Sequence, residues 1–264
     1  MAPPHPLQES LDYLPEYLGD AGHLFEVVEE RNAALTRARR AAGNKTGAGS
    51  PPVTHKSLNR AVVVAAVGAL EAFCEDLALR AQPLVPGAVP PAQWYAIAGT
   101  RGMVQTPNSN NIAKLFWTIF RYDPRPDWDL LLDASWAEVG SGTRWRGTTI
   151  SYKADAAARA LDAMVQVRHG FAHQDKASAP KSTPGVVEVT STQKLSLQSH
   201  HARNAMSMVV QVAVLTTHGL STMIPGTSRP LRWKAAMKQA GWGELLAGTP
   251  AAAEVKSGWT GHPF

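Results

Sequence analysis

The chain of 264 residues is long enough to bury a sizeable hydrophobic core, and 44% hydrophobic with 18% charged residues is ordinary usage for a globular protein. A net charge of +5 permits a polyanionic partner without indicating one. The longest apolar run, residues 61–70, is about half of the roughly 20 residues that span a bilayer.

Two further observations bear on the compartment. Residues 1–20 lack the basic start and the apolar centre of a signal peptide. The single cysteine, Cys74, cannot form an intrachain disulfide and lies in an apolar run, where we expect a small core residue rather than a nucleophile. We therefore expect a cytoplasmic protein that does not enter a membrane.

Apolar residues recur at helical intervals in several segments. We expect helices over residues 7–42 (with Pro15 and Gly19 breaking the first turns), 57–81, 112–120, 153–171 and 196–223. The helix at 57–81 is apolar almost all round in its first half, which is typical of a helix inside a bundle. The Asn-rich residues 108–111 should cap the helix that follows them. These elements predict an all-α fold, a helical bundle.

The remaining segments are less regular. Residues 121–150 carry Trp128, Trp136 and Trp145, which fit either the packing of short helices or a substrate platform. A brief extended pair is expected near residues 186–189. The Gly-rich residues 43–52 contain no Gly-Lys-Ser/Thr triplet, so we do not expect a phosphate loop there.

The end of the chain differs in composition from the rest. Residues 229–264 contain a short basic amphipathic segment and then a stretch rich in Gly, Ala and Pro. We therefore divide the chain into a helical domain, residues 8–223, and a short C-terminal appendage, residues 229–264.

The most informative motif is Arg-His-Gly-Phe-Ala-His, residues 168–173, at the end of a helical stretch. Arg168 offers a fixed fork of donors to a phosphate, and a histidine such as His173 can exchange a proton near neutral pH. On a straight helix these two residues would lie about 140° apart in azimuth. Gly170, followed soon by residues 174–176 and a loop, indicates that the helix ends or bends within the motif; alternatively, the motif could meet its copy across a two-fold axis.

Three acidic residues, Glu71, Glu75 and Asp76, interrupt the apolar surface of the helix at 57–81. They fit either a solvated stripe or an acid that orients a catalytic arginine or histidine.

The arrangement of these segments resembles a known family. Four features together resemble a HEPN domain. They are a long helix reading Ala-Leu-Glu-Ala-Phe-Cys-Glu-Asp-Leu (residues 69–77), an Asn-rich start to a short helix with Leu and Phe, a helix that closes on Arg-polar-x3-His, and a terminal packing helix. More narrowly, they resemble the RiboL-PSP-HEPN group. The resemblance covers roughly residues 8–223 and does not extend to the tail.

The resemblance implies a helical bundle, commonly a homodimer, in which many members are metal-independent endoribonucleases of toxin-antitoxin or phage-defence systems. It assigns catalytic roles to Arg168 and His173 and places His169 in the polar position after the arginine, where asparagine is common. It further implies an RNA substrate, no cofactor, and an antitoxin or a nucleotidyltransferase as a partner to look for.

The implied reaction is attack of the RNA 2′-hydroxyl on its own phosphodiester, which leaves a 2′,3′-cyclic phosphate and a 5′-hydroxyl. His173 would move protons and Arg168 would stabilise charge on the phosphoryl oxygens. A second acid or base is needed, and either His169 or the partner's His173 could supply it.

Other interpretations stay open. A domain of this type can bind RNA, a nucleotide or a partner protein without cleaving anything. Arg168 could simply stabilise a helix C-terminus, with His173 as an ordinary interface residue. His169 and His173, at i and i+4, could bind a metal ion. The adjacent His200 and His201 should point to different faces of their helix and form a weaker metal candidate.

Overall fold

The structure, a computed structural model, describes residues 5–43, 56–93, 106–140, 148–173, 180–189, 195–225 and 231. Helices make up most of this part: α1 (Gln8–Tyr17), α2 (Gly19–Ala41), α3 (Lys56–Ala81), α5 (Ser109–Phe120), α6 (Trp136–Val139), α7 (Asp155–His173) and α8 (Ser199–Ser221), with a 3-10 turn η1 (Arg125–Asp127). Among these helices, none is both long enough and apolar enough to cross a membrane.

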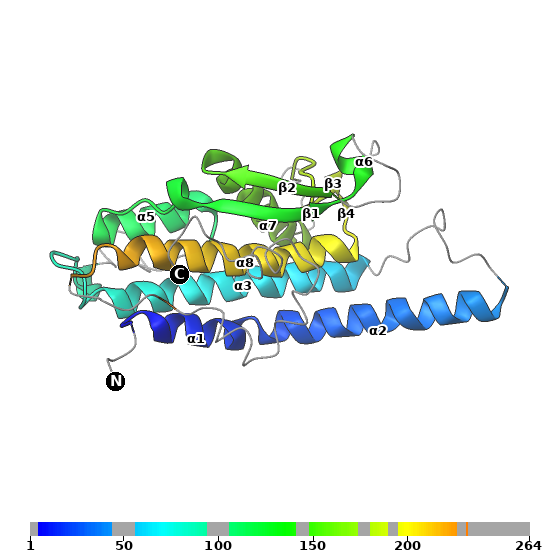
Figure 1. Ribbon diagram of the computed structural model, residues 1–264, viewed down its shortest axis with the longest axis horizontal. Coiled ribbons are helices and arrows are strands. Elements are labelled where there is room, and N and C mark those ends of the chain that lie inside the picture. The colour runs from blue at the N-terminus through cyan, green and yellow to red at the C-terminus, as the bar shows by residue number, and fades with distance from the viewer. Residues whose placement is uncertain are drawn as a thin grey trace.

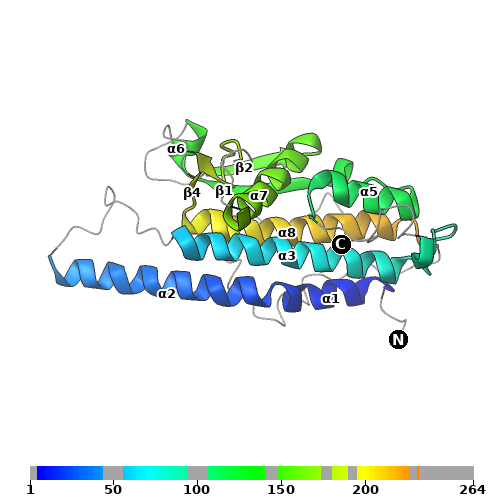
Figure 2. The same cartoon turned by 180° about the vertical axis from the view of Figure 1, so that it is seen from behind.

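The helices are arranged in layers around a central pair. α3 and α8 lie side by side along their length, with α1 and α2 in line on one side and α5, α7 and a β-hairpin on the other (Figure 1). The view from behind shows the same order (Figure 2). α8 is buried almost continuously from His201 to Thr217, as its apolar sequence requires at the centre of a bundle.

The hairpin is formed by β1 (Asp129–Ala134) and β2 (Thr148–Lys153), which pair antiparallel with Asp129 opposite Lys153. Along β1 every second residue is buried, namely Leu130, Leu132 and Ala134, because successive side chains of a strand point to opposite faces. A second, shorter pair joins β3 (Glu188–Val189) to β4 (Leu195–Ser196). The predicted helical bundle is present, but the fold is mostly helical rather than all-α.

The edge of β1 that does not pair with β2 is covered by carboxamide side chains of α8. Gln211 accepts from the Leu131 N–H at 2.8 Å and donates to the Leu131 carbonyl at 3.0 Å. One strand repeat further on, Asn204 bonds the N–H and the carbonyl of Asp133, at 3.2 and 2.6 Å. These side chains satisfy backbone groups that a third strand would otherwise pair.

The predicted helices at 57–81, 112–120, 153–171 and 196–223 are confirmed with shifts of a few residues at their ends. In place of one helix at 7–42, the structure has two helices that are separated at Leu18. Pro15 lies inside α1, and Gly19 begins α2. The predicted cap is also confirmed, since the Asn108 Oδ1 accepts from the Asn111 N–H at 2.8 Å.

Trp128 belongs to the core. Its side chain is fully buried and its Nε1 donates to the Thr216 Oγ1 at 3.0 Å. The interpretation of Trp128 as a packing residue is therefore correct, and its interpretation as part of a substrate platform is wrong. The side chain of Trp136 and all of Trp145 lie outside the described part of the chain.

The core extends slightly beyond the predicted domain. Leu7 is fully buried before α1, and Leu231, beyond α8, is also buried in the core. Leu231 is the part of the C-terminal appendage that the structure describes.

Candidate functional site

Arg168 lies on α7, where this helix packs on α3. Its side chain is 29% exposed and its Nη2 lies 3.9 Å from the Glu71 Oε2 on α3. This distance is that of an ion pair but too long for a hydrogen bond. Arg168 therefore lies beside a carboxylate that partly balances its charge.

Glu71 is the acid that approaches the motif. Burial raises its pKa above the ordinary value, the positive charge of Arg168 lowers it, and the negative charge of Glu75 raises it again. Asp76 instead accepts two hydrogen bonds from the Arg80 Nε, each 2.8 Å long, on its own helix. Two of the acids that the sequence singled out thus have different partners: Glu71 pairs with Arg168, and Asp76 pairs with Arg80.

The helix does not end at Gly170. α7 continues through it to His173, and Gly170 does not have the positive φ of a terminating glycine. The helix therefore ends at the last residue of the motif, His173, and not at Gly170. On this helix the backbone directs Arg168 and His173 about 140° apart.

Arg168 and His173 consequently lie on different faces of α7. His169 is half-buried and is not without an interaction partner, whereas the side chain of His173 lies outside the described part of the chain. His169 and His173 differ by about 40° in azimuth and share one face of the helix. Within one chain the α7 backbone does not direct the motif arginine and the terminal histidine towards one point.

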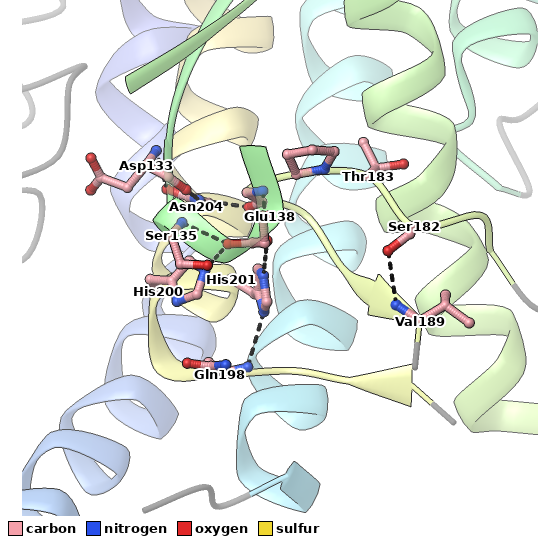
Figure 3. A network of polar contacts seen from close by, with 12 residues as sticks. Asp133, Ser135, Glu138, Ser182, Thr183, Val189, Gln198, His200, His201 and Asn204 are labelled. Atoms are coloured by element: carbon pink, nitrogen blue, oxygen red, sulfur yellow. Dashed lines mark hydrogen bonds and ion pairs between the residues drawn. The ribbon is translucent and has the colours of Figure 1, made fainter. Parts of the chain in front are cut away.

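A second polar cluster lies where α6 meets the start of α8 (Figure 3). The Glu138 carboxylate accepts from the Nε2 of His201 at 2.7 Å and contacts the Nε2 of His200 at 3.0 Å. We name these three residues the Glu138 cluster. The expectation that the adjacent histidines point to different faces is wrong in effect, because both rings reach a single carboxylate placed over the first turn of α8.

The Glu138 carboxylate is almost enclosed, with 5% of its side chain exposed. It also accepts from the backbone N–H of Ser135 at 2.7 Å and of Gly185 at 3.0 Å. Burial works to raise its pKa, but hydrogen bonds from His200 and His201 outweigh burial and hold the pKa well below the ordinary value. Glu138 is thus a buried anion that joins α6, the Gly185 turn and α8.

The three side chains are of the types that bind zinc or iron, and their ligand atoms lie within 4.8 Å of one another. The hydrogen bonds, however, fix a tautomer that does not suit a metal. The His201 Nδ1 accepts from the Gln198 N–H at 3.0 Å, so the ring proton of neutral His201 is on Nε2, facing Glu138. A metal-binding Nε2 would need that proton moved to Nδ1, against the Gln198 N–H.

The Glu138 cluster is therefore best explained as a structural connection. The sequence did contain one signal for it: Ser135 and Glu138 have the Ser-x-x-Glu spacing of a capping box, and the Glu138 side chain does bond the Ser135 N–H. The contact of His200 and His201 with Glu138 could not be foreseen, since these histidines come more than sixty residues later in the chain.

Two further candidates of the sequence are Cys74 and the Gly-rich segment. Cys74 is buried, and burial raises the pKa of its thiol far above the ordinary value, as expected of a core residue. Residues 44–52 of the Gly-rich segment lie outside the described part of the chain.

Comparison with known proteins adds nothing to these observations. No protein-family model, no curated protein and no solved structure matches the chain.

Proposed function

We propose that this protein is a metal-independent endoribonuclease of the HEPN type, with Arg168 and His173 as catalytic residues and His169 beside them. The observation that carries the proposal is the position of Arg168: it is part-exposed, on the helix that ends in His173, and opposite Glu71 without a hydrogen bond to it. A guanidinium held in this way keeps donors for the phosphate of a substrate.

The chemistry requires little beyond these groups. The substrate's 2′-hydroxyl supplies the nucleophile, so the reaction needs a histidine that takes its proton, a cation that stabilises the phosphoryl oxygens, and a second group that gives a proton to the leaving 5′-oxygen. Acid–base catalysis of this kind contributes about 10² to 10⁴ in rate. DNA lacks the 2′-hydroxyl and should not be cleaved. A toxin or phage-defence setting is the biological context that we propose, with an antitoxin or nucleotidyltransferase as a partner to test.

The divergence of Arg168 and His173 around α7 favours a site composed by two chains. In a homodimer with a two-fold axis near the end of α7, Arg168 of one protomer can face the partner's His173. His169, on the same face as His173, would then lie near the composite site and could provide the second acid or base. The proposed enzyme is for this reason a homodimer.

The first experiment is incubation of purified protein with total RNA and tRNA in EDTA, followed by mapping of the cleavage ends. Wild type should leave 2′,3′-cyclic phosphates and 5′-hydroxyls, and Arg168→Ala and His173→Ala should each be slower by about 10² or more. Arg159→Ala is the matched control, because Arg159 is exposed on the same helix, and it should cleave as wild type does.

A second experiment tests the composite site. Arg168→Ala and His173→Ala proteins are denatured together, refolded and assayed as a mixture. A site formed by Arg168 of one chain and the partner's His173 is intact once in each mixed dimer, so about a quarter of the wild-type sites should return. A mixture as inactive as its components would show instead that both residues must come from the same chain.

The alternative is a module that binds RNA, a nucleotide or a partner protein without cleaving it. The ion pair with Glu71 is the observation that favours it, since a partly neutralised arginine is a weaker stabiliser of new negative charge. Intact RNA in the wild-type reaction, with RNA retained by the protein in a filter-binding assay, would decide for this alternative.

A further inference from the structure

The outer face of α5 carries an exposed aromatic side chain between two cations. Lys114, Trp117 and Arg121 follow one another at i, i+3 and i+7, within about 60° of helix azimuth. Trp117 is 53% exposed, which makes it the most exposed large hydrophobic residue in the described part of the chain. Its neighbours Phe116 and Phe120, in contrast, are buried and already supply the inward face of this helix.

The two cations of this face are available to a ligand. Lys114 and Arg121 are both exposed, and no carboxylate among the described residues forms an ion pair with either. The position of Arg121 is fixed by the helix end: it is the C-cap in a left-handed conformation with φ 60°, and its N–H donates to the Trp117 carbonyl at 2.9 Å.

One edge of this face is held by polar contacts. Asn110, a turn before Lys114, accepts a 3.0 Å hydrogen bond from the Arg125 Nη1, and Arg125 is paired with Asp123 at 2.7 Å. The Arg125 charge is thus balanced within the protein, whereas the charges of Lys114 and Arg121 are not. The local excess on the face is therefore positive.

We propose that Lys114, Trp117 and Arg121 form a binding surface for single-stranded RNA, which we name the α5 face. One base stacks on the Trp117 indole, and the flanking phosphates lie against Lys114 and Arg121, which are about 10 Å apart along the helix axis. Stacking on an aromatic ring tolerates any base, so the surface takes RNA without sequence preference. The proposal rests on the proposed function in one respect only, namely that RNA is the ligand of this protein, whether or not the protein cleaves it.

RNA fits this face better than a second copy of the chain does. Lysine is depleted at the centre of protein interfaces, whereas here Lys114 and a second unpaired cation flank a single aromatic ring. A phosphate backbone pairs with both cations, while another copy of the same face would bring four positive charges together. Charge complementarity thus selects a polyanion.

The test is fluorescence anisotropy with a labelled 2′-O-methyl oligouridylate, which cannot be cleaved. Trp117→Ala should weaken binding about tenfold, and Trp117→Phe, which keeps a stacking surface, should stay within about threefold of wild type. The double variant Lys114→Glu with Arg121→Glu should weaken binding and make it less sensitive to salt. Lys181→Glu removes an exposed lysine elsewhere and should bind as wild type does.

Unchanged affinity of Trp117→Ala would overturn the proposal. If that variant binds RNA normally but loses its dimer in light scattering, the face is an interface between two copies instead. The result is separable from the nuclease proposal, because binding of an uncleavable RNA does not require catalysis. Wild type that binds this RNA through Trp117 and leaves natural RNA intact would support the α5 face and refute the nuclease.

Discussion

Gly185 shows how closely the chain approaches itself beside the Glu138 cluster. It has φ +74°, and a Cβ there would lie 2.8 Å from the Asp133 carbonyl oxygen and 3.3 Å from the Asn204 Nδ2. Its N–H donates to Glu138 and its carbonyl accepts from Asn204. Only glycine combines this conformation with this proximity at low cost.

We predict that Gly185→Ala lowers the free energy of unfolding by about 2–4 kcal/mol, from left-handed strain plus overpacking. Urea unfolding followed by circular dichroism measures it. Gly140→Ala separates the two contributions, since Gly140 has φ +63° with nothing within 4 Å of a Cβ, and it should cost about 1–2 kcal/mol. Equal losses in the two variants would mean that the contact with Asp133 is relieved without cost.

The Glu138 cluster should make stability fall in acid. Burial lowers the pKa of His201 below 6.5. As the pH falls through about 6.5, His201 therefore binds a proton in the unfolded chain but not in the folded chain, and the protein loses stability. The pKa of Glu138 is also lowered, so its contribution is present above about 4.5 and is lost below that pH. The loss should therefore come in two stages.

The measurement is the free energy of unfolding of wild type and of His201→Gln at several values between about pH 7 and pH 4. The buried His5, whose pKa is also lowered, contributes to both proteins, so the difference between them isolates His201. That difference should shrink as the pH falls from about 7 to about 5. A constant difference would show that His201 takes up no extra proton on unfolding.

At the same scale, the candidate site was only partly predictable. Arg168 and Glu71 were both recognisable as charged residues on helices expected to pack, and their pairing follows once α7 lies on α3. The partners of Glu138 were not, because a contact between α6 and α8 depends on how the hairpin returns the chain to the bundle. Local sequence patterns identify residues that are capable of chemistry. The tertiary structure decides which of these residues come into contact.

Among the elements, long helices were predictable and the hairpin was not. Helices such as α3 and α8 repeat their apolar pattern over several turns, and Asn108 marks the start of α5. β1 reads Asp-Leu-Leu-Leu-Asp-Ala, where three consecutive leucines hide the alternation of a strand. What makes this segment a strand and not a short helix is its pairing with β2 and the hydrogen bonds from the carboxamides of α8, which the local sequence does not reveal.

The carboxamide side chains of α8 support a further prediction about stability. Gln211→Leu should lower the free energy of unfolding by about 1–3 kcal/mol although it adds an apolar side chain to a buried position, because the Leu131 N–H and carbonyl lose their partners. Hydrogen exchange of the Leu131 amide should become faster. Gln166→Leu, at an exposed position of α7, is the control and should leave both quantities nearly unchanged.

Gly170 provides a prediction that links helix stability to activity. A Cβ at this position would meet nothing closer than 3.9 Å, and φ is not positive, so Gly170→Ala should raise the free energy of unfolding by about 0.5–1 kcal/mol. Thermal unfolding measures the gain. Loss of RNA cleavage together with greater stability would indicate that α7 must bend at Gly170 when substrate binds.

At the scale of the whole molecule, the first half of α2 is packed against the bundle and the second half is not. The buried residues of α2 are Ala21, Gly22, Phe25 and Val28, and none lies beyond them. Both views show the second half of this helix extending past the ends of α3 and α8 (Figures 1 and 2). Basic residues of the last turn, Arg39 and Arg40, lie favourably at the helix C-terminus, but this contribution is small beside that of burial.

Because an isolated helix of about three turns is marginal in water, the projecting half should open locally long before the bundle unfolds. We predict that the backbone amides of residues 30–41 exchange with solvent at least about a hundredfold faster than those of residues 21–28. Leu35→Ala should leave the global unfolding midpoint unchanged. Phe25→Ala, in contrast, should lower the free energy of unfolding by about 3 kcal/mol or more. Native-state hydrogen exchange resolves the two halves. Strong protection of residues 30–41 would mean that the projecting half is covered in solution, and protection that grows with protein concentration would identify a second copy as the cover.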